Sequence, residues 1–418
     1  MARYHIETYG CTSNRGESRR IEAALRDGGH RPADGPDEAD VAILNTCTVV
    51  EKTERNMLHR AEELDEQTPA DLVITGCMAL AQGEEFEQAG VDAEVLHWDE
   101  VPTYVRNGEC PTVTDGIDPV LDGVVGILPI ARGCMSDCSY CITKHATGKI
   151  DSPSVEENVE RARALVHAGA KELRITGQDT GVYGWDDGER KLHVLLERIC
   201  TGIEGDFQVR VGMANPKGVH GIREELAEVF AEHDELYDFI HAPVQSGSDD
   251  VLGDMRRQHQ VEEFREVVDT FDEYLDYWTL STDFIVGFPT ENDEDFGASM
   301  DLLRAVRPEK INVTRFSKRP GTDAADMKGL GGQVKKDRSK AMTDLKMDVV
   351  GDAYEAMVGD RREVLAVQQG TGGSVKCRDS AYRQVIVQEA GEHGIEPGDF
   401  LDVEITSHNT VYAFGEPV

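Results

Sequence analysis

The sequence has no apolar stretch long enough to cross a membrane. Hydrophobic residues make up 39% of its 418 residues, and no run of them approaches the roughly 18 residues that a spanning helix needs. The first residues, Met1-Ala2-Arg3-Tyr4-His5, lack the basic and apolar pattern of a secretory signal. We therefore expect a cytoplasmic protein with no membrane partner, long enough for two or three domains.

Basic residues are also scarce. The chain has 43 Lys and Arg against 80 Asp and Glu, a formal net charge of −37. This balance argues against a nucleic-acid partner, since such proteins usually carry a basic surface. The alternative is an organism with a salt-rich cytoplasm, whose proteins are acidic throughout. Residues 304–340 depart from the background with eleven Lys or Arg and four Asp or Glu. This basic island is predicted to be functional.

Cysteines number only nine, but three of them stand close together. Cys134, Cys138 and Cys141, the barrel triplet, are separated by three and then two residues. Thiolates hold iron–sulfur clusters, which usually take four cysteines, so three would leave one iron open to a small molecule. A structural zinc ion normally needs a fourth ligand. The least favoured interpretation is that the three cysteines are intracellular thiols that lie close together without binding a metal or taking part in catalysis.

A second set of cysteines follows three successive predicted strands. Residues 4–9, 41–44 and 72–75 have strand patterns, and Cys11, Cys47 and Cys77, the N-terminal triplet, come just after them. Ligands bind at the carboxyl edge of parallel α/β sheets, so these thiols are expected to converge. Ordinary buried cysteines are the alternative. The presence of a second triplet in the same chain favours metal binding.

The rest of the chain alternates strands and helices and then turns to strands alone. Six strand-and-helix repeats from residue 124 predict a partial (β/α)6 barrel, open on one side. Residues 360–418 predict a small antiparallel β-barrel. The fold class is therefore α/β, with a C-terminal β-barrel. The predicted divisions are an N-terminal α/β domain at 1–105, a linker at 106–123, the partial barrel at 124–345 and the small barrel at 358–418.

The barrel triplet, with Tyr140 before its last cysteine, resembles the signature of the radical S-adenosylmethionine enzymes. The resemblance implies a [4Fe–4S] cluster on Cys134, Cys138 and Cys141. It also implies that an electron from this cluster splits S-adenosylmethionine and releases a 5′-deoxyadenosyl radical. Gly10-Cys11, Asn45-Thr46-Cys47 and Gly76-Cys77 resemble the N-terminal domain of the methylthiotransferases, where three such cysteines hold a second [4Fe–4S] cluster. The last domain resembles the RNA-binding TRAM domain by its position and strand pattern.

The family resemblance also implies binding residues at the other strand ends. Those expected near S-adenosylmethionine are Tyr140, Thr176, Gly177, Gln178, His241, Gln245, Ser246, Ile285 and Gly287. A histidine such as His241 is also common as a hydrogen-bonded core residue. Residues of the basic island that suit base stacking and phosphate contact are Arg315, Phe316, Lys318 and Arg319. A core position for Phe316 is the alternative.

Two loops, Gln178–Gly184 and Gly212–Pro216, resemble the archaeal and eukaryotic branch of the methylthiotransferases. That branch converts N6-threonylcarbamoyladenosine at position 37, beside the tRNA anticodon, to its 2-methylthio form. The resemblance implies that one S-adenosylmethionine methylates sulfur at the N-terminal triplet, and that the radical from another removes hydrogen from C2 of the adenine. A cofactor is expected for this step because C2 is unactivated towards acid–base chemistry. An electron donor and a sulfur source are further expected partners, and the acidic composition suggests a halophilic archaeon.

Three alternatives remain open. The chain could belong to the branch that acts on isopentenyladenosine in tRNA, or to the branch that modifies an aspartate of a ribosomal protein, since one fold hosts several substrates. An iron–sulfur protein that binds RNA without catalysis is the alternative from another class.

Overall fold

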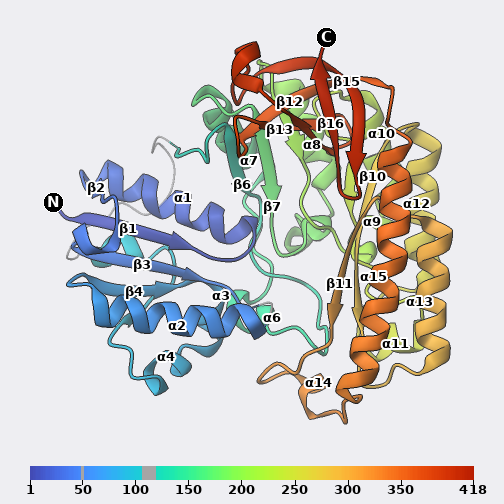
Figure 1. The fold of residues 1–418 in the computed structure, drawn as a ribbon. Helices are drawn as coiled ribbons and strands as arrows, with labels where there is room; N and C mark the ends of the chain where they lie inside the picture. The colour runs from blue at the N-terminus through green and yellow to red at the C-terminus, as the bar shows by residue number, and fades with distance from the viewer. Residues whose placement is uncertain (49–50, 106–118) are drawn as a thin grey trace.

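The computed structural model of the protein describes residues 1–48, 51–105 and 119–418, so Cys110 and most of the predicted linker lie outside it. Figure 1 shows an N-terminal α/β unit on one side, a curved array of strands and helices on the other, and a small β-barrel above that array. Within the described residues, no helix is both long and apolar enough to cross a membrane.

The N-terminal unit is a parallel five-stranded sheet with helices packed on it. The strand order is β2-β1-β3-β4-β5. Every residue of the third strand, Val41–Thr46, is buried, which is typical of a central strand covered on both faces. The strands are β1 (Arg3–Thr8), β2 (Arg31–Pro32), β3 (Val41–Thr46), β4 (Asp71–Thr75) and β5 (Glu94–Val95). The helices are α1 (Thr12–Asp27), α2 (Glu51–Gln67), α3 (Gly76–Gln82), α4 (Glu84–Gln88) and α5 (Val101–Val105).

The predicted partial barrel is confirmed. Two parallel three-stranded sheets, β6-β7-β8 and β9-β10-β11, are joined by bridges between Val209 and Leu236 and between Met213 and His241. Among the described residues, β6 forms no ladder with β11, so the ring stays open on that side. The strands are β6 (Val125–Pro129), β7 (Glu172–Thr176), β8 (Gln208–Arg210), β9 (Phe239–His241), β10 (Thr279–Val286) and β11 (Lys310–Arg315).

Helices cover the outside of this barrel (Figure 1). Ser154 is the N-cap of one of them, because its hydroxyl accepts a hydrogen bond from the Glu157 backbone N–H at 3.1 Å. The helices are α6 (Thr143–Thr147), α7 (Val155–His167), α8 (Leu192–Gly202), α9 (Pro216–His220), α10 (Arg223–Glu232), α11 (Asp249–Asp254), α12 (Val261–Tyr274), α13 (Asp293–Val306), α14 (Asp323–Asp326) and α15 (Gly332–Glu355).

The C-terminal strands form a closed barrel in the order β12-β13-β14-β16-β15. The predicted small barrel is confirmed, but one pairing differs from the expected antiparallel pattern. β14 and β16 are parallel, because the chain crosses the barrel through β15 before it returns beside β14. The strands are β12 (Arg361–Gln369), β13 (Val375–Asp379), β14 (Gln384–Val387), β15 (Phe400–Asn409) and β16 (Tyr412–Pro417).

The small barrel packs against the amino-terminal ends of the larger barrel's strands. Its turn at 379–383 carries the contacts. The Asp379 carboxylate accepts a hydrogen bond from the Tyr277 hydroxyl at 2.7 Å, and Arg383 donates to the Trp278 carbonyl at 2.9 Å. The Tyr382 ring lies 5.0 Å from the Phe239 ring, at the first residue of β9. The acidic C-terminal domain therefore closes the end of the barrel at which the strands begin.

The N-terminal unit is held to the barrel by helix packing and by one buried ion pair. Helix α1 lies against β6 at Gly16, where a Cβ would come within 2.9 Å of Ile127. Arg319, which follows β11, donates to the Glu54 carboxylate of α2 at 2.6 Å. Their side chains are only 5% and 9% exposed. This pair joins segments 265 residues apart.

We expect Arg319→Ala to lower the free energy of unfolding by about 3–5 kcal/mol, because Glu54 would keep a buried charge without its partner. Urea unfolding of the variant and the wild type measures the loss. Arg304→Ala is the matched control, since it breaks an exposed pair with Asp301 at 2.8 Å and should cost about 0–1 kcal/mol. Equal losses in the two variants would contradict the role given to the buried pair.

Candidate functional site

The barrel triplet lies on the loop between β6 and α6. Gly133 has a φ of +84°, and a Cβ there would come within 2.0 Å of the Lys149 carbonyl oxygen. The Cys134 N–H donates to the Gly148 carbonyl at 3.3 Å, and the Cys141 N–H donates to the Cys138 carbonyl at 3.2 Å. These bonds fold the loop back on itself, so all three thiols remain at the carboxyl edge of the barrel.

A buried arginine lies beside this loop. Arg257 Nη1 is 3.5 Å from Cys138 Sγ and 3.5 Å from the Tyr140 hydroxyl, and its Nη2 donates to the Pro243 carbonyl at 2.8 Å. Burial raises the pKa of the Cys141 thiol. A buried thiolate therefore needs positive charge, which Arg257 supplies in part and a bound metal would supply in full. No sequence pattern pointed to Arg257, which lies 119 residues from Cys138.

The loop after β7 supports the barrel triplet. Gln178, predicted to be near the cofactor, accepts a hydrogen bond from the Gly133 N–H at 2.7 Å. Thr176 is buried, and a Cβ on Gly177 would lie 3.3 Å from the Ala131 carbonyl oxygen. These three predicted residues therefore stand directly beside the cysteine loop.

Asp179, the next residue, was not among the predicted site residues, although it lies in the same loop. Its Oδ1 accepts hydrogen bonds from the Asn215 and Gly181 N–H groups at 2.9 and 3.2 Å. Its Oδ2 is buried and has no hydrogen-bond partner among the described residues. Burial raises the pKa of Asp179 to about 6, against the opposing effect of those two N–H groups. A buried carboxylate oxygen without a partner at a strand end suits a ligand's donor group.

His241 and Gln245 lie at the next strand ends. His241 Nε2 is 3.2 Å from both carboxylate oxygens of Asp283, and Asn312 also donates to that carboxylate at 2.7 Å. Burial opposes ionisation of Asp283, but the hydrogen bonds from His241 and Asn312 lower its pKa overall. Gln245 has a φ of +77°, and its buried Oε1 has no partner in the described part of the chain. Strain of this kind in a non-glycine residue is common at binding sites.

The other residues predicted to bind the cofactor lie at further positions along the carboxyl edge of the barrel. Ser246 is buried, and its hydroxyl is 3.4 Å from that of Ser299. The Gly287 N–H donates to Glu291 at 2.9 Å. Ile285 and Tyr140 are partly buried against the aromatic core formed by Phe288 and its neighbours. Their roles towards S-adenosylmethionine stay predictions.

The N-terminal triplet lies where β1, β3 and β4 end. A Cβ on Gly10 would come within 2.7 Å of the Cys47 Cβ, and one on Gly76 within 2.4 Å of the Thr46 carbonyl oxygen. The three cysteine-bearing turns are therefore packed against one another. Asn14 links two of these turns by hydrogen bonds, since its amide donates to Asn45 Oδ1 at 3.0 Å and to the Thr46 carbonyl at 3.1 Å. The three turns therefore meet at one edge of the sheet, and metal binding by their thiols stays a prediction.

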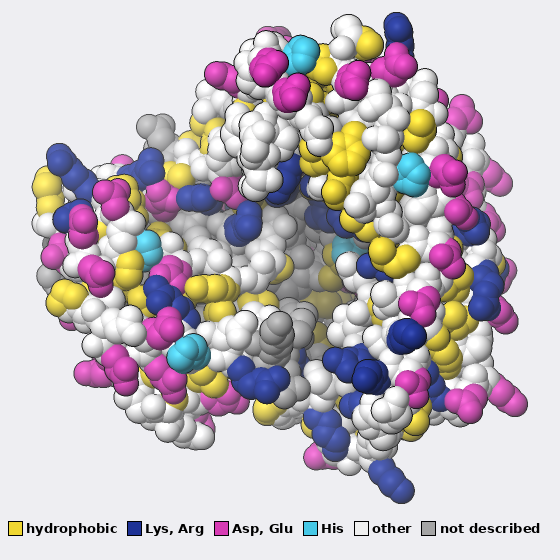
Figure 2. Space-filling view, viewed as in Figure 1, with side chains coloured by type: hydrophobic (Ala, Val, Ile, Leu, Met, Phe, Trp, Pro, Cys, Tyr) yellow, Lys and Arg dark blue, Asp and Glu magenta, His cyan; other side chains and the backbone are white. Residues whose placement is uncertain are grey.

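The sheet edges that carry the two triplets face the same space. The carboxyl ends of β1 and β3 point towards the centre of the molecule, as do those of β6 and β7 (Figure 1). Helix α3, which contains Cys77, packs against α6, which follows Cys141. Glu17 and Arg132 both act electrostatically on Cys77. Figure 2 shows a hollow between the N-terminal unit and the barrel, with Lys and Arg side chains on its walls.

The spacing of the thiols fits a cluster better than a single ion. Zinc–sulfur bonds are about 2.3 Å long, so two sulfurs on one zinc lie at most about 4.6 Å apart. In the described part of the chain, neither triplet is among the groups of three ligand atoms that lie within 4.8 Å of one another. An iron–sulfur cluster binds each thiolate to a different iron and therefore accepts wider spacing. Thiolate donors are also those that iron–sulfur clusters require.

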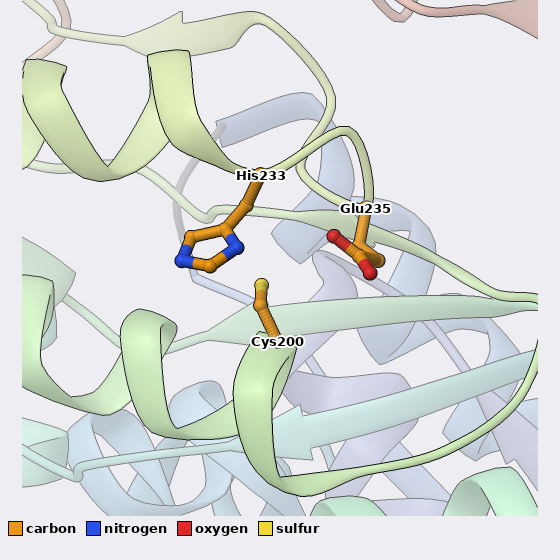
Figure 3. A group of neighbouring side chains, drawn as sticks. All are labelled: Cys200, His233 and Glu235. Carbon is orange, nitrogen blue, oxygen red and sulfur yellow. The ribbon is translucent and has the colours of Figure 1, made fainter.

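Two such close groups do occur among the described residues, but both contain His233 and lie away from the triplets. Figure 3 shows the imidazole of His233 and the carboxylate of Glu235 directed towards the thiol of Cys200. His233 is already hydrogen-bonded through Nε2 to Glu197 at 2.6 Å. Because Glu235 precedes β9, this group lies at the opposite end of the barrel from the cysteine loop, and we assign it no part in the site.

The four predicted RNA-contact residues differ in their exposure. The side chains of Arg315 and Lys318 are exposed. Phe316 is 6% exposed, and its ring packs against Phe288 with 5.3 Å between centroids. Arg319 is buried in its pair with Glu54. In this structure Phe316 thus occupies the core position given above as its alternative, and RNA contact stays a prediction for Arg315 and Lys318.

Two family models match the chain, and solved structures share its fold. The model of the Radical SAM superfamily matches residues 128–303, and that of "Uncharacterized protein family UPF0004" matches residues 3–96. The radical S-adenosylmethionine methyltransferase TsrM from Kitasatospora setae aligns with a TM-score of 0.56 at 13% identity, over 88% of this chain and 78% of that one. The cobalamin-dependent S-adenosylmethionine radical enzyme OxsB aligns with a TM-score of 0.54 at 12% identity, over 83% and 56%.

Curated proteins match over the whole chain. A probable threonylcarbamoyladenosine tRNA methylthiotransferase of Archaeoglobus fulgidus is 35% identical, covering 99% of this chain and 98% of that protein. One of Pyrococcus abyssi is also 35% identical, covering 100% and 99%. The human threonylcarbamoyladenosine tRNA methylthiotransferase is 30% identical, covering 99% and 73%. The chain therefore belongs to the radical S-adenosylmethionine family of threonylcarbamoyladenosine tRNA methylthiotransferases.

Proposed function

We propose that this chain transfers a methylthio group to C2 of N6-threonylcarbamoyladenosine at position 37 of tRNA. The single observation that carries the proposal is the placement of two cysteine triplets, one on each of two sheets, around one hollow. The relatives' names indicate the same reaction. The isopentenyladenosine and ribosomal-protein alternatives have no comparable support among these relatives.

Each triplet is proposed to hold one [4Fe–4S] cluster. Cys134, Cys138 and Cys141 would hold the first, and Cys11, Cys47 and Cys77 the second. A cluster at the first triplet would supply electron transfer to S-adenosylmethionine, and one at the second would supply a site for the sulfur to be transferred. Arg257 holds positive charge beside Cys138, and Gln178 fixes the backbone of the cysteine loop. Hydrogen bonds to thiolate sulfur of this kind tune a cluster's reduction potential.

The remaining binding roles follow from position. Gln245 and Asp179, at the carboxyl edge of the barrel, each have a buried side-chain oxygen with no hydrogen-bond partner among the described residues. These oxygens could accept hydrogen bonds from a ligand, and S-adenosylmethionine is the ligand proposed for that edge. The anticodon loop is proposed to enter through the open side of the barrel between β6 and β11. Arg315 and Lys318 lie on β11 or just after it and can contact RNA phosphates there.

The proposal also includes two reaction partners, the identity of the C-terminal domain and the type of cell. An external electron donor and an external sulfur source are needed, because the chemistry consumes both. The C-terminal barrel is proposed to be a TRAM domain, and the acidic composition fits the cytoplasm of a halophilic archaeon.

Mass spectrometry of tRNA nucleosides tests the reaction and the substrate together. In cells without this gene, we expect the 2-methylthio form to be lost and the unthiolated threonylcarbamoyl nucleoside to accumulate. The wild-type gene should restore the product. An unchanged nucleoside profile after deletion would refute the proposed substrate.

The two triplets should be separable by mutation. Cys134→Ala should abolish 5′-deoxyadenosine formation, because the cluster that cleaves the cofactor would lose a ligand. Cys47→Ala should stop methylthio transfer while leaving part of the cofactor cleavage, because it removes a ligand of the other cluster. Liquid chromatography of nucleosides after reaction of the reconstituted protein measures both products.

Cys377→Ala is the control for these two variants, since Cys377 is a buried cysteine of the C-terminal barrel, remote from both triplets. It should retain both products. Methylthio transfer by Cys47→Ala at the wild-type level would exclude the N-terminal triplet from the reaction.

The backbone of the barrel triplet should also be sensitive to a single methyl group. Gly133→Ala would bring its Cβ within 2.0 Å of the Lys149 carbonyl oxygen, so we expect it to lose most of the iron bound at this triplet. Gly148→Ala is the matched control: Gly148 also has a positive φ, of +71°, but nothing lies within 4 Å of its Cβ position. Iron analysis after reconstitution measures the difference. Equal iron contents would contradict this account of the loop.

A further inference from the structure

The inside of the barrel contains a group of positive side chains that the proposed chemistry does not yet use. Arg174 and Arg210 are paired across β7 and β8. Lys310 begins β11, and Arg378 comes from the C-terminal domain. We call these four residues the cation cluster.

Aromatic rings hold the cation cluster together. Arg210, Lys310 and Arg378 lie 5.7, 5.5 and 4.7 Å from the Tyr382 ring. Arg210 and Lys310 also lie 5.0 and 5.6 Å from the ring of Phe239. Three cations from three different strands therefore meet over the aromatic floor that the C-terminal domain completes.

Negative charge near the cluster is insufficient to balance it. Glu172 bonds to Arg174 at 2.5 Å. Among the described residues, Arg210, Lys310 and Arg378 form no ion pair with a carboxylate, and the Nε atoms of Arg210 and Arg378 are buried without a partner. Burial and then the neighbouring arginines lower the pKa of Lys310 to about 8. Like charges in such proximity repel, and an anion bound among them would relieve the repulsion.

The cluster lies one layer inside the predicted cofactor site. Arg174 precedes Thr176 by two residues on β7, and Lys310 precedes Asn312 by two residues on β11, next to Asp283 and His241. Two residues along a strand span about 6.6 Å. A nucleobase held at the carboxyl edge of the barrel can therefore reach the cluster with a substituent of several bonds.

We propose that the cation cluster binds the carboxylate of the threonylcarbamoyl group and so selects the modified adenosine. This inference rests on the proposed function and adds the substrate feature that is recognised. The threonyl carboxylate lies at the end of the N6 substituent, several bonds beyond the ring, where it can extend to Lys310 and Arg210. The phosphates of the RNA backbone flank the base outside the barrel, so they are less suited to this internal position.

The test compares two anticodon stem-loop RNAs, one with the threonylcarbamoyl acid and one with its neutral methyl ester. Both are tested with the reconstituted full-length protein, and both kcat/KM for methylthio transfer and Kd by fluorescence anisotropy are measured. The wild type should prefer the acid by about 10- to 100-fold, the range expected for hydrogen bonds to a charged group. Lys310→Gln and Arg210→Gln should each reduce that preference at least about fivefold.

Two further variants keep the result interpretable. Lys310→Arg should retain most of the preference, because it keeps the charge. Arg198→Gln should retain all of it, because Arg198 is exposed on α8 and pairs only weakly with Glu156 at 3.8 Å. Protein atoms surround the Lys310 ammonium group, but the residue keeps solvent-exposed surface at the first position of β11, so its replacement should fold even where Arg210→Gln does not.

Each contrary result has a distinct meaning. A wild type that treats acid and ester alike would overturn the inference, as would variants that lose affinity for both RNAs equally, which would indicate phosphate contact. Loss of cofactor cleavage without RNA would place the cluster at S-adenosylmethionine instead. A wild type that methylthiolates neither RNA would refute the proposed function itself.

Discussion

The structure depends on one constraint of parallel sheets, that their strands all end at the same edge. This constraint brings Cys11, Cys47 and Cys77 together although they are far apart in the sequence, because each follows a strand of one sheet. The barrel triplet lies at the same kind of edge in a second sheet. Packing of α1 on β6 and of α3 on α6 turns the two edges towards each other. Two simple sheets thereby create one hollow with two sets of thiols.

The C-terminal domain has a structural role that its charge did not suggest. It has only five Lys and Arg against ten Asp and Glu between residues 360 and 418, yet several of those cations face the barrel. Arg383 bonds to Trp278 and Glu309, Arg362 lies 3.7 Å from the Tyr277 ring, and Arg378 joins the cation cluster. The domain thus closes the barrel and supplies part of its inner wall. Acidic residues outnumber basic ones in this domain, but arginines form its contacts with the larger barrel.

Sequence patterns predicted the features that depend on residues close together in the chain. The strands and the turns that carry the cysteines follow from periodicity and from local chemistry. The residues that the sequence did not reveal act over long separations: Arg257 reaches Cys138 across 119 residues, and Arg319 reaches Glu54 across 265. The aromatic Phe316 matched a stacking pattern but lies in a buried cluster. The parallel pairing of β14 with β16 likewise follows from barrel closure, which no local pattern encodes.

The most direct test of the account is an electron paramagnetic resonance measurement on the reduced, reconstituted protein, together with iron analysis. If each triplet holds a [4Fe–4S] cluster beside the same hollow, the protein should bind about eight iron atoms per chain and show magnetic coupling between two reduced clusters. Cys11→Ala should then remove the coupling and leave the signal of one isolated cluster. A wild type with about four irons and an uncoupled signal, unchanged by Cys11→Ala, would contradict the central claim that both triplets form metal centres facing one another.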